Sequence, residues 1–237
     1  MITTAPELIY MLKVNIGIAL FYAFYKLFCC RDTFFQWRRI ALLSFLALSF
    51  LYPLMDMQAW VKEQPAINEL ADYYTLMMLT ETNTSTATVV TTPVAIPTPG
   101  LLDIIKFIYW IGILLLSARF MIQLSSIFHL VLKSKSINVD QISIRSLSEP
   151  ANPFSFWQWI FVYLPELKED EKQEILTHEQ THVRQWHSID VIISEIVNII
   201  CWMNPFAWLM KTEIRLNLEY LADHKVCLLY TSPSPRD

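Results

Sequence analysis

The sequence predicts a mainly α-helical integral membrane protein, in which three transmembrane helices precede a helical domain with a small β-ribbon. Hydrophobic residues make up 54% of the 237 residues and only three residues are glycine, which is too apolar for an ordinary soluble domain of this length. Three apolar runs approach or reach the roughly 20 residues that a helix needs to cross a bilayer. A short stretch of alternating apolar residues after residue 135 predicts the β-ribbon.

Residues 1–55 contain the first two predicted transmembrane helices. Residues 8–28 form an apolar run of about one bilayer thickness, and residues 40–54 form a second run that reaches spanning length if it continues to Trp60. The first run is too long for a signal-peptide core, and no cleavage site of small residues follows it. We therefore expect it to remain in the protein. Residues 101–132 contain the third helix.

The distribution of basic residues predicts the orientation in the membrane. The loop between the first two helices carries Arg31, Arg38 and Arg39, whereas residues 56–100 carry one basic residue against five acidic ones. Basic residues favour the cytoplasmic side. We therefore expect the N-terminus outside, residues 56–100 as an extracytoplasmic loop, and residues 133–226 as a domain that faces the cytoplasm.

One short motif in this last domain carries specific chemistry. His178 and His182 are four residues apart in the segment HEQTH, and this spacing stacks two side chains on one face of a helix. Two imidazoles so placed can bind one Zn²⁺, with Glu179 beside them to take a proton from water. No proline or glycine interrupts residues 166–189, so a helix is expected there.

A catalytic zinc site normally has a third protein ligand. His187 is five residues after His182, about 140° further around a helix, and no glycine breaks the helix between them. His187 is therefore expected to point away from the zinc. Glu219 is the better candidate, because Asp223 lies one helical turn further on and could orient a ligand.

Other acidic residues compete with Glu219 for this role, namely Glu213 and Glu195. A further condition applies to Glu219: it reaches the side of His178 only if the apolar segment of residues 189–210 turns back at Asn204-Pro205.

The segment before the motif offers a possible binding surface for substrate. Apolar residues alternate between Ile137 and Ile144, and the aromatic run PFSFWQWIFVYLP follows, so two or three short strands are expected. Such a ribbon could bind an extended substrate by strand addition beside the metal. Packing against the membrane surface is the alternative.

Charge and cysteine content exclude other classes of function. The net charge of −4 argues against direct binding of nucleic acid. The four cysteines form no C-x-x-C pair and lie in or next to apolar stretches. We interpret them as reduced packing residues rather than a disulfide framework.

The segments HEQTH, HSID and WMNPFAWLMKTEIRLNLEYLAD resemble the membrane-embedded zinc peptidase domain of BlaR/MecR-type β-lactam sensor-transducers, most clearly over residues 152–226. The resemblance implies a zinc metalloendopeptidase of gluzincin type, with His178, His182 and Glu219 as Zn²⁺ ligands and Glu179 as base. It also implies signalling by regulated proteolysis of the chain itself or of a cytoplasmic transcriptional repressor, in the inner membrane of a bacterium.

The chain departs from that family pattern in three respects. His187 stands where the sensor-transducers have an acidic residue, and Asp190 follows three residues later. A fourth spanning helix and a penicillin-binding sensor are missing from the sequence, so recognition of β-lactams is not inferred. Residues 227–237 lose the helical pattern, and we expect a non-native or truncated tail.

The mechanism expected from these residues is zinc-assisted peptide hydrolysis. Asp190 and Asp223 could accept N–H bonds from the ligating imidazoles. Arg215 and Asn217 are considered as donors to the oxyanion, but both are expected to face solvent. Two alternatives use the same site: a quality-control membrane metallopeptidase, and a non-enzymatic signal transducer that zinc stabilises.

Overall fold

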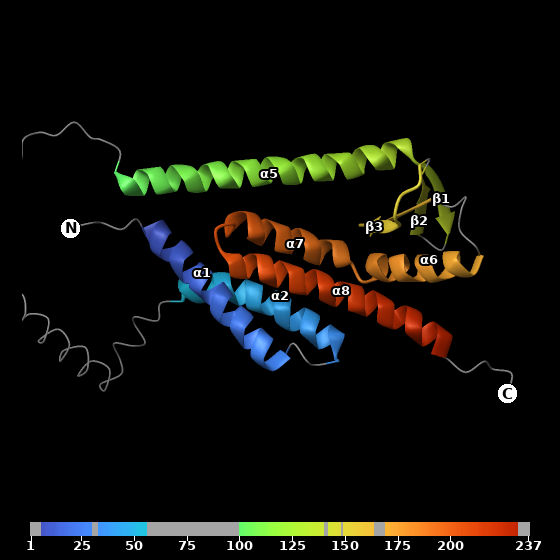
Figure 1. Cartoon of the computed structure of the whole chain (residues 1–237), viewed down its shortest axis with the longest axis horizontal. Helices are drawn as coiled ribbons and strands as arrows, with labels where there is room; N and C mark the ends of the chain where they lie inside the picture. The colour runs from blue at the N-terminus through green and yellow to red at the C-terminus, as the bar shows by residue number, and fades with distance from the viewer. Residues whose placement is uncertain are drawn as a thin grey trace, which may run out of the picture.

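The computed structural model of the chain describes residues 6–29, 33–55, 100–139, 142–147, 149–163 and 169–231. Within these ranges it contains a set of helices and one small sheet (Figure 1). The predicted extracytoplasmic loop lies outside the described residues except for Gly100, as do Arg31 and the last six residues of the predicted tail.

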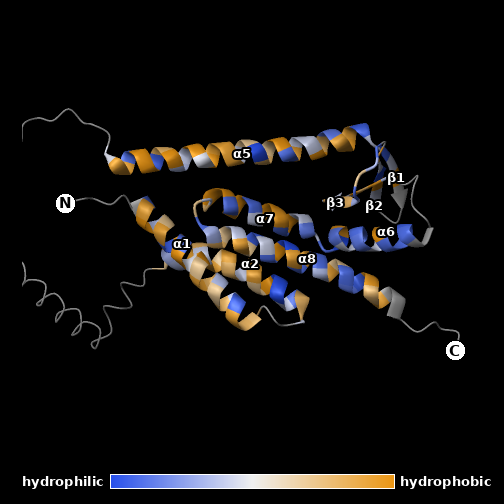
Figure 2. Ribbon diagram, viewed as in Figure 1, coloured by the Kyte–Doolittle hydropathy of each residue, from blue (hydrophilic) through white to orange (hydrophobic). Residues whose placement is uncertain are grey.

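Among the described residues, three helices are long and apolar enough to cross a membrane. They are α1 (Pro6–Phe24), which continues as a π-helical turn over Tyr25–Cys29, α2 (Phe35–Leu51), which a 3₁₀ turn over Tyr52–Leu54 extends, and α5 (Leu101–Lys133). Hydrophobic residues predominate along α1 and α5 (Figure 2), and many of them are exposed. On α5, for example, Leu114 is 69% exposed. A bilayer accommodates such a surface and water does not. The prediction of a mainly helical membrane protein with three spanning helices is therefore confirmed.

Helix α2 begins earlier than the sequence predicted. Arg38 and Arg39 were assigned to a loop, but both lie inside this helix. The reason is that each guanidinium has a partner within the protein. Arg38 Nη2 donates to the Tyr25 hydroxyl at 2.6 Å, and Arg39 Nε donates to Asp190 at 2.6 Å. These bonds offset the cost of taking the charges out of water.

The sheet has four strands rather than the expected two or three. They are β1 (Lys135–Val139), β2 (Ile142–Ser146), β3 (Phe154–Phe156) and β4 (Trp159–Val162). Their order in the sheet is β1-β2-β4-β3, with β2 and β4 parallel and the other pairs antiparallel. Strand β3 is therefore an edge strand. Buried Phe161 of β4 packs with Val131 of α5, which holds the sheet at the end of that helix.

Within the described part of the chain, three more helices follow the sheet: α6 (Glu169–Arg184), α7 (His187–Ile200) and α8 (Pro205–Thr231). The chain reverses between α7 and α8, as the position of Glu219 required. Asn204 stabilises this turn, because its Oδ1 accepts the Phe206 N–H at 3.0 Å and its Nδ2 donates to the Asn15 carbonyl of α1 at 3.0 Å. Pro205 then begins α8, where a missing N–H costs nothing.

Helix α8 passes between α1 and α2 on one side and α6 and α7 on the other (Figure 1). Its buried side chains form one apolar cluster with α1 and α2, made of Tyr25, Leu42, Leu46, Met210, Ile214, Leu218 and Leu221. The helix does not end at residue 226 as predicted but continues to Thr231.

Helix α5 meets the rest of the helical bundle at the turn between α7 and α8. The Tyr109 hydroxyl donates to the Ile200 carbonyl at 2.8 Å, and Trp202 Nε1 donates to the Tyr109 carbonyl at 3.3 Å. Gly112 allows this approach, because a Cβ at this position would lie 2.4 Å from the Trp202 ring.

We expect Gly112→Val to lower the free energy of unfolding of the detergent-purified protein by about 1–3 kcal/mol, since the added side chain forces the Trp202 ring away from α5. The melting temperature checks this expectation. Gly100→Val is the matched control, because the nearest atom to a Cβ there is 3.6 Å away. Equal melting temperatures for the two variants would contradict the role assigned to Gly112.

Candidate metal centre

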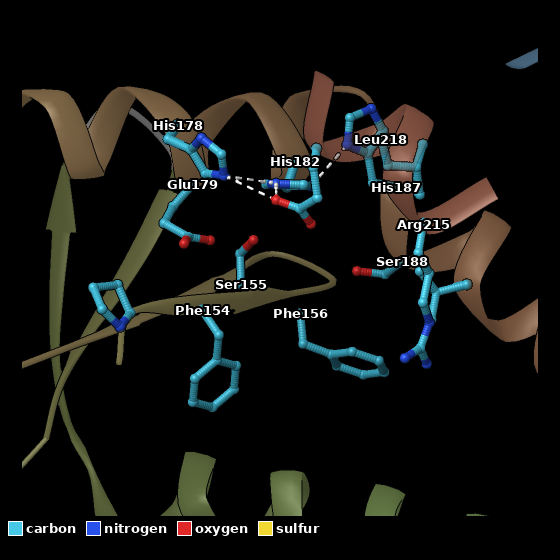
Figure 3. Close-up of a pocket in the computed structure, with 13 residues that line it drawn as sticks. Phe154, Ser155, Phe156, His178, Glu179, His182, His187, Ser188, Arg215 and Leu218 are labelled. Carbon is cyan, nitrogen blue, oxygen red and sulfur yellow. Dashed lines mark hydrogen bonds and ion pairs between the residues drawn. The ribbon is translucent and has the colours of Figure 1, made fainter. Parts of the chain in front are cut away.

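The motif predicted from sequence lies on α6, where Figure 3 shows His178 and His182 beside each other. The return of α8 brings Glu219 to these two residues. The Nε2 atoms of His178 and His182 are 3.1 Å apart. Glu219 Oε2 lies 3.4 Å from His178 Nε2 and 3.7 Å from His182 Nε2. One atom from each of the three side chains therefore faces a common point.

This donor set fits a metal ion. The three ligand atoms lie within 4.8 Å of one another. Two imidazole nitrogens and one carboxylate oxygen are a usual protein ligand set for Zn²⁺ at a site that keeps a position open.

The electrostatics of the cluster reflect this close approach. Hydrogen bonding to Glu219 raises the pKa of His178, against the opposing effect of burial. Hydrogen bonds from His178 and His182 hold the pKa of Glu219 well below its usual value. The carboxylate is therefore ionised throughout the physiological range.

The other candidate ligands have partners elsewhere. Glu213 pairs with Lys26 of the π-helical turn after α1 at 2.6 Å. Glu195 pairs with Lys211 of α8 at 2.5 Å. Of the three carboxylates weighed for the third position, Glu219 is the one that the fold brings to the imidazoles.

A pocket of about 400 Å³ opens beside the cluster. Glu179 is only 7% exposed and lines it, and Figure 3 shows its carboxylate directed from α6 toward strand β3. The facing wall is β3, with Phe154, Ser155 and Phe156. The aromatic run before the motif was the sequence signal for this wall, but sequence reasoning assigned no particular residue to it.

Asp190 and Asp223 were both predicted to accept N–H bonds from the ligand imidazoles, and the structure brings one of them, Asp223, to a ligand. Asp223 Oδ1 lies 3.0 Å from His178 Nδ1, the nitrogen that faces away from Glu219. Asp190 differs from the expectation: its carboxylate is buried and bonded to Arg39. The bond to a guanidinium satisfies this buried charge better than a neutral imidazole would.

His187 is not one of the three grouped ligands, as expected, but the unbroken helix predicted before it is wrong. The helix does break before it, although no glycine is present: α6 ends at Arg184, and Trp186 adopts a left-handed conformation with φ 57°. His187 Nδ1 then lies 2.8 Å from His182 Nδ1. Burial lowers the pKa of His187 to about 3, so its ring is neutral. A tryptophan rarely adopts positive φ, so the sequence carried no signal for this break.

The two suggested oxyanion donors, Arg215 and Asn217, differ in their exposure to solvent. Arg215 is exposed and lines the pocket, where Glu195 Oε2 lies 3.6 Å from its Nη2. Asn217 was expected to face solvent, but its side chain is buried. It is 1% exposed, and its Nδ2 donates to the Phe35 carbonyl of α2 at 3.0 Å.

The structure has apolar helices of membrane-spanning length next to a domain in which two imidazoles and a carboxylate meet beside a pocket. These are features of a membrane metalloprotein that acts on a bound molecule. Comparison with models of known families specifies the kind. The model described as BlaR1 peptidase M56 matches residues 11–233, nearly the whole chain. The chain therefore belongs to the BlaR1 peptidase family M56, a family of metallopeptidases, and the resemblance seen in the sequence is confirmed. A search of curated proteins found no match.

We expect Zn²⁺ affinity to fall as the pH is lowered, because metal binding requires neutral imidazoles. The pKa of His178 is raised from 6.5, so proton competition begins above that pH and grows as the pH falls. Zinc affinity measured by chelator competition between pH 8 and pH 5 checks this. An affinity that stays constant over the whole range would contradict binding through His178.

Proposed function

We propose that the chain is a membrane-embedded zinc metalloendopeptidase, with His178, His182 and Glu219 as ligands and Glu179 as the catalytic base. The observation that carries this proposal is the convergence of Glu219 from α8 on the two imidazoles of α6, beside a pocket that Glu179 lines. Family membership supports it independently. When bound, Zn²⁺ would supply Lewis-acid activation of water and of the scissile carbonyl.

Glu179 would move the proton in this reaction. Its carboxylate is held by the helix that carries both ligand imidazoles, and it faces the pocket from a buried position. It would accept a proton from the attacking water and return it to the leaving amine. Asp223 would keep the His178 ring in one orientation through the Nδ1 contact.

Substrate would bind along strand β3. This strand pairs with β4 on one side and forms the edge of the sheet on the other, and three of its residues line the pocket. An extended peptide could add to that edge through main-chain hydrogen bonds. Such binding selects an unfolded or loop segment of a protein rather than a compact domain.

The biological role proposed for this activity is signalling by regulated proteolysis, with the chain itself or a cytoplasmic transcriptional repressor as substrate. The proposed orientation is N-terminus outside and active site toward the cytoplasm of a bacterial inner membrane. Two contacts support that orientation. The arginine-bearing end of α2 joins α7 through Arg39 and Asp190, and the C-terminal end of α5 joins the sheet. With this orientation, the site would lie on the side where basic residues favour the cytoplasm.

We expect about one Zn²⁺ per chain in the detergent-purified protein. Glu219→Ala should lose most of this zinc, because only two of the three protein ligands remain. Glu179→Gln should keep zinc and lower hydrolysis of an unfolded protein substrate by about 10²–10⁴-fold, since general base catalysis is lost. Metal analysis and a fluorogenic casein assay measure the two effects.

Glu174→Gln is the matched control, since Glu174 is an exposed carboxylate on the same helix. It should retain both zinc and activity. Undiminished hydrolysis by Glu179→Gln would refute the assigned base. Zinc without hydrolysis in the native sequence would favour the non-enzymatic transducer.

A further inference from the structure

The two ligand imidazoles have different partners on the side away from the metal centre. His178 Nδ1 faces the carboxylate of Asp223 at 3.0 Å. His182 Nδ1 faces His187 Nδ1 at 2.8 Å, and His187 is only 2% exposed. One ligand is therefore oriented by a carboxylate on α8, and the other by a buried imidazole on α7.

The contacts of His187 allow one consistent arrangement of protons. With a metal bound, His182 Nε2 would give its lone pair to the ion in place of its hydrogen bond to Glu219, so the proton of the neutral ring would lie on Nδ1. That N–H donates to His187 Nδ1, which places the His187 proton on Nε2. The Nε2 atom lies 3.3 Å from Gln185 Oε1, to which it donates.

The same amide oxygen links this chain of hydrogen bonds to the membrane helix α2. Gln36 Nε2 donates to Gln185 Oε1 at 3.1 Å. The chain of donors and acceptors thus runs from Gln36 through Gln185 and His187 to His182. In this chain, His182 donates to His187, and both His187 and Gln36 donate to the Gln185 amide oxygen.

Helix α2 also holds the backbone at this point. Arg39 Nη2 donates to the Gln185 carbonyl at 2.8 Å, and Arg39 Nε donates to the buried Asp190 at 2.6 Å. Gln185 precedes the left-handed Trp186, and Asp190 lies in the first turn of α7. Arg39 therefore fixes the chain on both sides of His187.

We propose that His187 is a positioning residue that orients the metal ligand His182, and that α2 sets the position of His187 through Gln36 and Arg39. The proposal rests on the proposed function, because it takes His182 as a ligand. A displacement of α2 in the membrane would then alter metal affinity and site geometry, although no residue of α2 is itself a ligand.

The test uses the full chain in detergent, with Zn²⁺ affinity from chelator competition and the visible absorption spectrum of the Co²⁺-loaded protein. His187→Phe fills the space but cannot accept a hydrogen bond. It should lower zinc affinity about 10–100-fold and change the cobalt spectrum. His187→Asn keeps an acceptor and should restore most of the affinity. His129→Phe, at an exposed histidine of α5, should match the native protein.

Gln36→Leu tests the link to α2 without altering a buried residue, since the Gln36 contact is exposed. It should lower zinc affinity by about 2–10-fold, the effect of losing one neutral hydrogen bond, and it keeps the test valid if His187→Phe does not fold. The link to α2 is overturned if Gln36→Leu binds Zn²⁺ like the native protein.

The outcomes separate this inference from the proposed function. If the native protein binds Zn²⁺ and the His187→Phe variant has the affinity and cobalt spectrum of the His129→Phe control, the positioning role is wrong and the peptidase site stands. If the native protein binds neither metal, both proposals fail.

Discussion

The site depends on the reversal of the chain between α7 and α8. Without it, Glu219 would lie far from the imidazoles of α6, since an uninterrupted helix advances about 1.5 Å per residue. Asn204 and Pro205 supply the local chemistry of the turn, and the bond from Asn204 to the Asn15 carbonyl ties it to the first membrane helix. The apolar cluster that α8 forms with α1 and α2 then holds Glu219 in place.

Partly buried polar contacts connect α2 to residues near the candidate metal ligands. Arg39 bonds to Asp190 and to the Gln185 carbonyl, and Asn217 bonds to the Phe35 carbonyl of α2. Apolar packing alone would allow helices to slide or rotate, whereas these bonds have directional requirements. They join the domain directly to α2, so the position of this helix and the position of the residues that flank the site depend on each other.

The helices and the core of the site were predictable because they follow from local spacing. Runs of apolar residues indicated α1, α2 and α5. The four-residue spacing of His178 and His182 indicated a shared helical face, and a turn at Asn204-Pro205 was the condition set for Glu219 to reach the side of His178. The helical limits were less accurate. Helix α2 begins before residue 40, where Arg38 and Arg39 have partners elsewhere in the fold, and α8 continues past residue 226.

The sequence by itself determined the membrane class, the helix that carries both imidazoles, and Glu179 as the neighbouring carboxylate. Only the tertiary structure decided the partners of these groups. It brought Glu219 rather than Glu213 or Glu195 to the imidazoles, and His187 rather than Asp190 to His182. Periodicity fixes the face of a helix on which a side chain lies. The contacts between side chains distant in sequence depend instead on how helices cross and on breaks such as the left-handed Trp186, which packing imposes against local preference.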